Sequence, residues 1–191
     1  MKTILLMRHS ISEKMDIPTE YLPLSEKGKQ IVYNKQIGKI DKCFCSPYKR
    51  AIETANILFN NVVVLDNLHE RIIGDATADF WYKQYCDYNY KNPGGESLNE
   101  VKNRMLNAIT YILSNTSDGM VSLVISHATA ICAYLLNYCT IEVINVPNKI
   151  RKILFNNKEI LNGKINPTDY FIIKYEKDMV IDISFVSDNI K

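Results

Sequence analysis

The stretch Ile4-Leu5-Leu6-Met7-Arg8-His9-Ser10 places an arginine and a histidine directly after a continuous apolar run. An unbroken short apolar run is typical of a strand that is buried on both faces of a sheet. It is too short for the apolar region of a signal peptide and no small-residue cleavage site follows, so it predicts a first strand. Arg8 and His9 are therefore expected at the carboxyl end of that strand.

Further apolar runs alternate with helical patterns along the chain. Strands are predicted at 42–45, 62–65, 121–125, 170–174 and 180–185, and helices at 25–38, 46–58, 97–113 and 128–138. Ser97 and Glu100 form a capping box, and Ser46 followed by Pro47 is a favourable start for the helix at 46–58.

Apolar strands separated by helices predict an α/β fold with three layers, α/β/α, around a mostly parallel central sheet. A chain of 191 residues with 47% hydrophobic content suffices for one core, so we expect residues 1–191 to form a single domain. The polar and aromatic stretch 75–92 predicts a small cap segment. Trp81, Tyr85 and Tyr88 recur there at near-helical spacing; most of these rings are expected to pack the cap, and one or two to line a pocket mouth.

The charge balance gives no indication of a nucleic-acid or membrane partner. The chain has 23 Lys and Arg against 21 Asp and Glu, and its one dense basic stretch, Lys149–Lys152, is interpreted as a solvated face. No apolar run approaches the roughly eighteen residues needed to span a bilayer. Five cysteines without a Cys-x-x-Cys pair favour free thiols in a reducing compartment. We expect a cytoplasmic protein, and the sequence leaves its oligomeric state open.

Chemically compatible side chains follow three of the predicted strands. The first strand ends at Arg8 and His9, the second runs toward Arg50, and the fourth ends at Ser126 and His127. Parallel sheets bind ligands at the carboxyl ends of their strands. One Arg-His pair alone is equally typical of a hydrogen-bonded structural histidine, but the three strand ends together favour a phosphate site.

The chemistry of these residue types supports that prediction. Two arginines can bind a phosphate through paired, charge-assisted hydrogen bonds. Nearby positive charge lowers the pKa of an imidazole and keeps it neutral, as attack on phosphorus requires. The sequence contains no glycine-rich phosphate loop and no His/Cys/Asp cluster with metal-ligand spacing. We therefore expect catalysis without a metal or any other cofactor.

These residues resemble the motifs of the histidine phosphatase superfamily, the phosphoglycerate-mutase-like proteins. The segment 8–10 resembles the family's Arg-His-Gly, the segment 46–55 is similar to Ser-Pro-x-x-Arg-Ala-x-x-Thr-Ala at every fixed position, and 124–127 resembles Val-x-Ser-His. Further similar segments are Leu24–Gly28, Leu68–Gly74 and Gly94–Ser97. The resemblance covers nearly the whole chain in the family's order and favours the small phosphatase branch.

The resemblance implies a metal-independent, acid-type phosphatase that hydrolyses phosphomonoesters through a phosphohistidine on His9. Glu70 would donate a proton to the leaving alcohol, and His127 would act in catalysis as well as in binding. The implied phosphate ligands are Arg8, Arg50, His127 and Ser10.

Several assignments keep an alternative. Glu70 is also compatible with a surface carboxylate paired with Arg71, and Glu96 with either a supporting role or a plain loop position. His69 is interpreted as a bystander. Ser10 and Ala128 stand where the family has glycine, so we expect a slightly changed pocket shape.

Two other functions stay open. Phosphoglycerate-mutase-type phosphoryl transfer is one, although such mutases are longer and carry segments that exclude water. The other is a non-catalytic phosphate-binding regulatory protein, which only Ser10 and Ala128 favour. The expected partner is a small phosphorylated substrate, and the sequence does not identify the natural phosphoester.

Overall fold

The computed structural model describes residues 1–187, and a six-stranded sheet in the order β3-β2-β4-β1-β8-β9 forms its centre. The strands are β1 (Lys2–Arg8), β2 (Lys42–Cys45), β3 (Val62–Val64), β4 (Val121–Ser126), β8 (Tyr170–Glu176) and β9 (Met179–Val186). The first four are mutually parallel, whereas β8 and β9 add to β1 as an antiparallel hairpin. The predicted α/β class with a mostly parallel sheet is confirmed. Residues 188–191 of the expected single domain lie outside the described residues.

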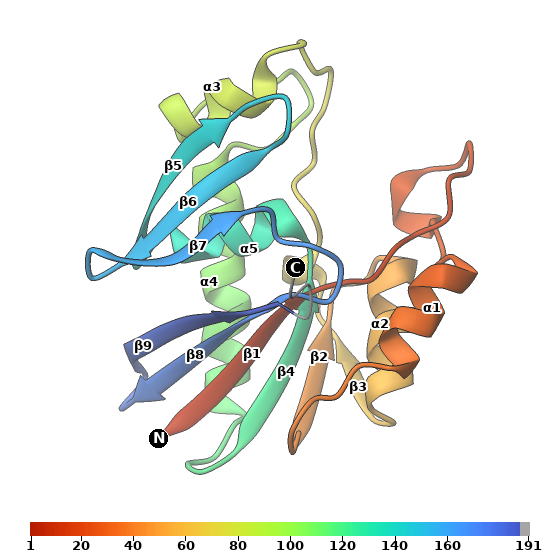
Figure 1. The fold of residues 1–191 in the computed structure, drawn as a ribbon, viewed down its shortest axis with the longest axis vertical. Coiled ribbons are helices and arrows are strands. Elements are labelled where there is room, and N and C mark those ends of the chain that lie inside the picture. Colours follow the sequence, from red (N-terminus) through yellow and green to blue (C-terminus); the bar gives the residue numbers. More distant parts are fainter. Residues whose placement is uncertain (188–191) are drawn as a thin grey trace.

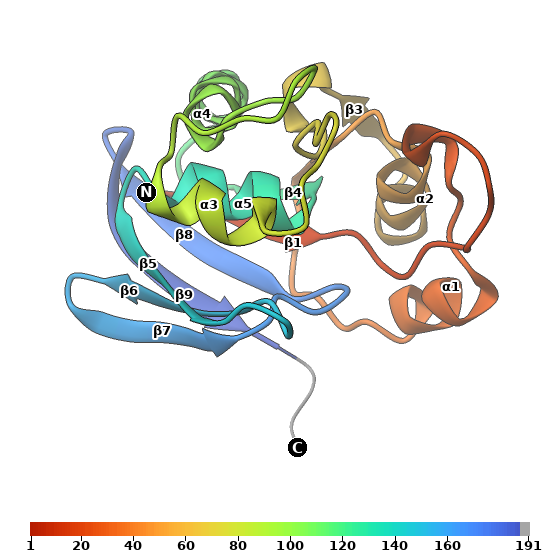
Figure 2. The same ribbon diagram turned by 90° about the horizontal axis from the view of Figure 1, so that it is seen from above.

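Helices cover both faces of this sheet. Figures 1 and 2 show α4 (Leu98–Ser114) and α5 (Ala128–Leu135) on one side and α1 (Glu26–Tyr33) and α2 (Lys49–Leu58) on the other. Side chains of β1 alternate between two apolar clusters: Ile4 and Leu6 pack with α4 and α5, and Leu5 and Met7 pack with α2. The unbroken apolar run of β1 thus reflects burial on both faces, and the three-layer prediction is confirmed.

Helix boundaries differ from the predictions at three places. α1 ends at Tyr33 and α5 at Leu135, a few residues earlier than expected. α2 begins at Lys49 with Tyr48 as its N-cap, so the prediction that Ser46 caps this helix was wrong. The hydroxyl of Ser46 is instead engaged with His127. The capping box at α4 is present as predicted, between Ser97 and Glu100.

A second sheet, which the sequence analysis did not predict, follows α5. It consists of three antiparallel strands, β5 (Cys139–Asn145), β6 (Ile150–Phe155) and β7 (Lys158–Gly163). Asn156 and Asn157 join β6 to β7 with positive φ angles of 49° and 62°, as a tight hairpin turn with asparagines favours. Ile153 is fully buried against the α4–α5 cluster, so this sheet shares the main core.

The interpretation of Lys149–Lys152 as a solvated face was wrong at one position. Arg151 lies in β6 and is only 4% exposed. It shares the inward face of the strand with Ile153, because side chains two positions apart point to the same side of a sheet. One cation of this basic stretch, Arg151, is therefore buried inside the molecule.

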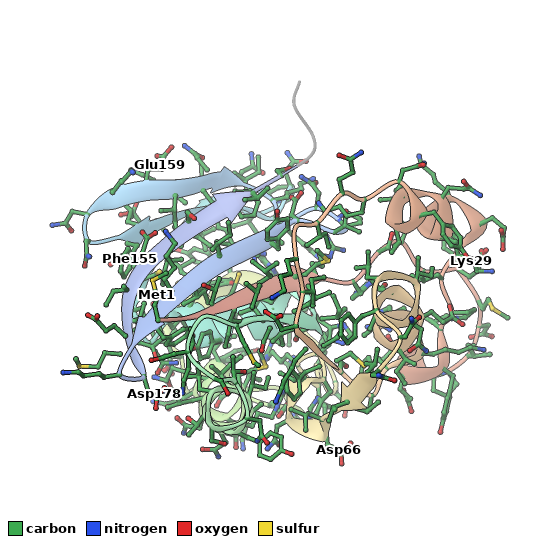
Figure 3. The ribbon with its side chains drawn as sticks, turned by 90° about the horizontal axis from the view of Figure 1, so that it is seen from below. Met1, Lys29, Asp66, Phe155, Glu159 and Asp178 are labelled. Carbon is green, nitrogen blue, oxygen red and sulfur yellow. The ribbon has the colours of Figure 1, made fainter. Side chains whose placement is uncertain are left out.

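The cap region contains α3 (Phe80–Cys86), which lies near β5 and β6 above one side of the central sheet (Figure 1). Trp81 is buried and its ring centroid lies 5.4 Å from that of Tyr85, whereas Tyr88 follows the end of the helix and packs against the main core. Figure 3 places Phe155 and Glu159 of the second sheet at the opposite end of the molecule from Lys29 of α1. Within residues 1–187, no helix combines the length and apolar character needed to cross a membrane.

Candidate active site

The register of the central sheet brings the three strand ends to one level. Arg8 of β1 pairs with Ser126 of β4, and Cys45 of β2 pairs with Ile125. The pairing continues past the strands, because the N–H of His9 donates to the carbonyl of Ser126 at 2.9 Å. As predicted, the residues after these strands meet at one edge of the sheet.

His9 has a defined tautomer and is only 8% exposed. Its Nδ1 lies 2.5 Å from the carbonyl oxygen of Ser10, and its Nε2 lies 3.0 Å from Nε of Arg50. Because a carbonyl oxygen only accepts, Nδ1 carries the proton and Nε2 presents a lone pair. Burial, and then the charges of Arg50 and Arg8, lower the pKa of His9 to about 3. The imidazole is therefore neutral at physiological pH.

His127 is completely buried beside His9, with 4.8 Å between the two ring centroids. Nη2 of Arg50 lies 3.2 Å from its Nδ1, and Oγ of Ser46 lies 2.7 Å from its Nε2. An arginine only donates, so Nδ1 is the acceptor and Nε2–H donates to Ser46. Burial, followed by the adjacent His9 ring and the charge of Arg50, holds the pKa of His127 well below its usual range.

The two arginines approach the site from different sides. Arg50 Nη1 donates to the carbonyl of Thr19, and its guanidinium lies 5.0 Å from the centroid of the Tyr48 ring. Nη1 of Arg8 donates to the carbonyl of Ile165 at 2.5 Å. Burial lowers the pKa of both groups. In the part of the chain that the structure describes, neither guanidinium has a carboxylate in a salt bridge, so both charges remain available to an anion.

The carboxylate of Glu70 lies at the N-terminus of α5, the helix that begins directly after His127. Its Oε1 accepts from the N–H groups of Arg71 at 2.8 Å and Ala130 at 3.0 Å, and its Oε2 accepts from Thr129 at 3.3 Å. The guanidinium of Arg71 binds Gln84 and the carbonyl of Glu96 rather than this carboxylate. Oε2 accepts only the longest of these bonds, so it has the fewest backbone hydrogen bonds of the two oxygens.

A pair missed by sequence reasoning holds the loop that carries Glu70. Both carboxylate oxygens of Glu96 accept from Arg104, at 2.8 and 2.9 Å. Arg104 also donates to three backbone carbonyls, those of Asn67, His69 and Glu70. Glu96 therefore supports the site from outside it, and no sequence pattern around Arg104 indicated this role.

Ser10 is fully buried with both its polar donors engaged inside the protein. Its hydroxyl donates to the carbonyl of Gly28 at 2.8 Å, and its N–H donates to Oγ1 of Thr54 at 3.1 Å. A side chain at Gly28 would place its Cβ 2.1 Å from the carbonyl oxygen of Ile11, so this close approach requires glycine. These contacts give Ser10 a role in holding the turn after β1; phosphate binding by Ser10 stays a prediction.

His69 lies closer to the site than a bystander would. Its ring stacks on Tyr48 with 6.2 Å between centroids, and its Nδ1 lies 2.7 Å from the carbonyl oxygen of Glu70. Together with Tyr48 and Ile72 it lines a cavity of about 560 Å³.

Glu70 also lines a second cavity, of about 360 Å³. Arg8, Ala128 and Thr129 are among the other residues that line it. Among residues 1–187, no group of three or more His, Cys, Asp or Glu side chains could hold a metal ion. Metal-independent catalysis stays a prediction.

The sequence profile of the histidine phosphatase superfamily (branch 1) matches residues 4–152. The chain belongs to this superfamily. No curated protein matches the sequence significantly.

Solved structures share the fold of this superfamily member at low sequence identity. YhfR of Bacillus stearothermophilus has a TM-score of 0.69 and 18% identity, covering 95% of each chain. A mycobacterial glucosyl-3-phosphoglycerate phosphatase in complex with inorganic phosphate has a TM-score of 0.69 and 18% identity, covering 97% of this chain and 95% of its own. The protein TTHB049 of Thermus thermophilus has a TM-score of 0.63 and 15% identity, covering 95% of this chain and 98% of its own.

Proposed function

We propose that this superfamily member is a phosphomonoester hydrolase that works through a phosphohistidine on His9. One observation carries the proposal: the proton of His9 is on Nδ1, so its Nε2 carries the lone pair; Arg50 contacts this nitrogen, the charge of Arg8 also acts on the ring, and neither guanidinium has a salt-bridge partner among the described residues. A neutral imidazole beside two arginines is suited to attack the phosphorus of a bound phosphate.

In the first step, Nε2 of His9 forms a bond to phosphorus while the bond from phosphorus to the ester oxygen breaks. Arg8 and Arg50 bind the other phosphate oxygens and balance the charge that develops on them. Because Nε of Arg50 donates to this lone pair, the substrate must replace that hydrogen bond with one between Arg50 and phosphate. The leaving alcohol takes its proton from Oε2 of Glu70.

In the second step, water attacks the phosphohistidine and gives a proton to Glu70. The nitrogen–phosphorus bond breaks, phosphate leaves, and His9 and Glu70 return to their starting protonation states. Burial and the hydrogen bond that its Nδ1 accepts from Arg50 keep His127 neutral, and the hydrogen bond from its Nε2 to Ser46 fixes its ring next to the reacting groups. No metal or cofactor enters either step.

The test is covalent labelling under rapid quench. Brief reaction with a ³²P-labelled phosphoester should leave acid-labile, base-stable phosphate on the chain, and His9→Ala should remove both the label and turnover. His69→Ala, which removes a histidine at the rim, should keep the label. Adding EDTA should change neither result. Normal turnover by His9→Ala would refute the proposal.

The same experiment separates hydrolysis from the two alternatives. A mutase would pass the label to an added acceptor alcohol faster than to water. A non-catalytic phosphate-binding protein would bind phosphate but take up no label. The known phosphatase among the structural neighbours supports hydrolysis, since the mycobacterial protein is named as a phosphatase and shares this fold.

A further inference from the structure

The cavity of about 360 Å³ beside Glu70 is strongly cationic. Its walls include one carboxylate, that of Glu70, and five cations contributed by Arg8, Arg71, Lys149, Arg151 and Lys164. Arg8 ends β1 and Arg71 lies in the loop before the cap segment 75–92, whereas Lys149, Arg151 and Lys164 lie in or next to the strands of the second sheet. Arg8 and Arg50 already supply two positive charges for the transferred phosphoryl group. That group therefore does not account for the other four cations of the cavity.

Two buried arginines that line this cavity have no salt-bridge partner among the described residues. Arg71 and Arg151 are each 4% exposed, and Nη2 of Arg71 and Nε of Arg151 have no hydrogen-bond partner. In the described residues, the guanidinium of Arg151 donates only to Sγ of Cys132, at 2.7 Å. Burying a cation without a salt-bridge partner is unfavourable, so an anionic ligand bound here would offset part of that cost.

These guanidinium groups are also held in fixed positions. The guanidinium carbon of Arg151 lies 5.3 Å from the centroid of the Trp81 ring and 5.7 Å from that of Tyr85. Arg71 is held by Gln84 at 2.9 Å. Prepositioned planar donors bind phosphate or carboxylate with less loss of side-chain freedom than mobile ones. The aromatic residues of α3 thus serve to orient a cation.

Two exposed lysines stand at the mouth of the same cavity. Lys149 lies at the end of the β5–β6 turn, with a φ angle of 53° and its N–H donating to the carbonyl of Val146. Lys164 follows β7 directly. Within residues 1–187 neither lysine forms a salt bridge, and both line the cavity. Their charges can attract a second anion before it reaches the buried arginines.

We infer that this cavity binds a second anionic group on the alcohol part of the substrate. The inference rests on the proposed function and names its substrate class: phosphomonoesters whose leaving alcohol carries a further phosphate or carboxylate. Glu70, on the wall between the catalytic edge and the cationic cavity, would then face the ester oxygen while Arg71 and Arg151 bind the distal anion.

Three phosphoesters of equal carbon number test this inference. Propyl phosphate has no second anion, 3-phosphonooxypropanoate carries a carboxylate, and propane-1,3-diol bisphosphate carries a phosphate. We expect kcat/KM to be about tenfold or more higher for at least one of the doubly anionic esters, as for a gained charge-assisted hydrogen bond. The preferred ester identifies which anion the cavity binds.

The variant K149Q/K164Q should reduce this preference severalfold. Lys158→Gln provides the matched control, because Lys158 is an exposed lysine of β7 that does not line the cavity. It should keep the preference of the parent. Both lysines of the double variant lie at the cavity mouth rather than in the core, so folding is expected to be retained and can be checked by the melting temperature.

Calorimetric titration with inorganic phosphate gives a readout that does not depend on turnover. The parent should bind phosphate at two sites, and K149Q/K164Q should weaken one of them. Equal kcat/KM for all three esters, with normal turnover of propyl phosphate and a single phosphate site, would overturn the inference and leave the proposed function intact. No turnover of any ester with two phosphate sites would instead overturn the proposed function and retain the cationic anion site.

Discussion

Nε of Arg50 lies 3.0 Å from Nε2 of His9, so the lone pair of the proposed nucleophile accepts a hydrogen bond from this guanidinium. The same guanidinium reaches His127 through Nη2 and the Thr19 carbonyl through Nη1. One planar group therefore fixes two imidazole rings and a loop. A bound phosphate would compete for these donors, which couples substrate binding to release of the nucleophile.

Arg50→Lys should be severely impaired, although it keeps the positive charge. An ammonium group cannot reach His9, His127 and a phosphate with the fixed geometry of the guanidinium. We expect kcat/KM to fall by roughly 10²-fold or more, the usual cost of losing a placed electrostatic group. Vanadate should inhibit the parent competitively and the variant poorly. Lys49→Gln, a change at the start of α2, is the control. Equal inhibition of parent and Arg50→Lys would place Arg50 outside the phosphate site.

The stability of the protein should fall as the pH decreases below about 6.5. The pKa of His9 is lowered from its ordinary value of 6.5 to about 3, so between these values the unfolded chain binds a proton that the folded chain does not. The free energy of unfolding therefore decreases toward low pH, by at most about 1.4 kcal/mol per pH unit for this group. His9→Gln should reduce that slope. Urea titrations in phosphate-free buffer at pH 7 and pH 5 measure it, and an identical slope in the variant would contradict the assignment.

Much of the fold could be predicted because a strand that is buried on both faces appears in the sequence as an unbroken apolar run. The apolar run of β1 and the capping box of α4 are local signals, and local signals set where elements begin. The second sheet was missed although β5 alternates apolar and polar residues and Asn156-Asn157 favours a tight turn. Its strands are as long as β1 and β4 but half exposed, so their apolar pattern is weaker than the unbroken runs of those two central strands.

Candidate site residues that directly follow a strand could be predicted from the sequence. Residues whose role depends on contacts with distant parts of the chain could not. His9 and His127 meet because β1 and β4 are adjacent and parallel. The role of Arg104 depends on a contact with the distant loop at His69, and that of Arg151 on contacts with the distant helix α3, and no local pattern encodes either. Ser46 was interpreted as a helix cap because Ser-Pro is a common helix start, yet its hydroxyl serves His127.

Ser46→Ala should weaken both stability and catalysis. The change leaves Nε2–H of His127 without a partner in a fully buried position. Leaving such a donor unpaired costs about 1–3 kcal/mol in the free energy of unfolding. With the His127 ring no longer fixed, kcat should fall by a larger factor than KM rises. Ser46→Thr, which keeps the hydroxyl, should restore part of kcat. A stability loss without any change in kcat would limit Ser46 to a structural role.

The last prediction concerns Glu70 as the proton donor. An alkoxide needs a proton in order to leave, whereas p-nitrophenolate is stable enough to leave without one. Glu70→Gln should therefore slow phosphorylation of the enzyme by an alkyl phosphate by roughly 10²–10⁴-fold, the usual contribution of a placed general acid. The same variant should affect p-nitrophenyl phosphate much less.

Single-turnover phosphorylation rates are the measurement, because they exclude slow hydrolysis of the phosphohistidine. The glutamine amide of Glu70→Gln would also face backbone N–H groups of α5 and weaken that helix start, which slows both substrates alike. Glu96→Gln supplies the comparison: it loosens the Arg104 contacts that hold the same loop without touching the carboxyl of Glu70. A selective loss with alkyl phosphate in Glu70→Gln, against a uniform loss in Glu96→Gln, identifies proton donation. Uniform slowing in both variants would mean that Glu70 orients the site and that the proton comes from elsewhere.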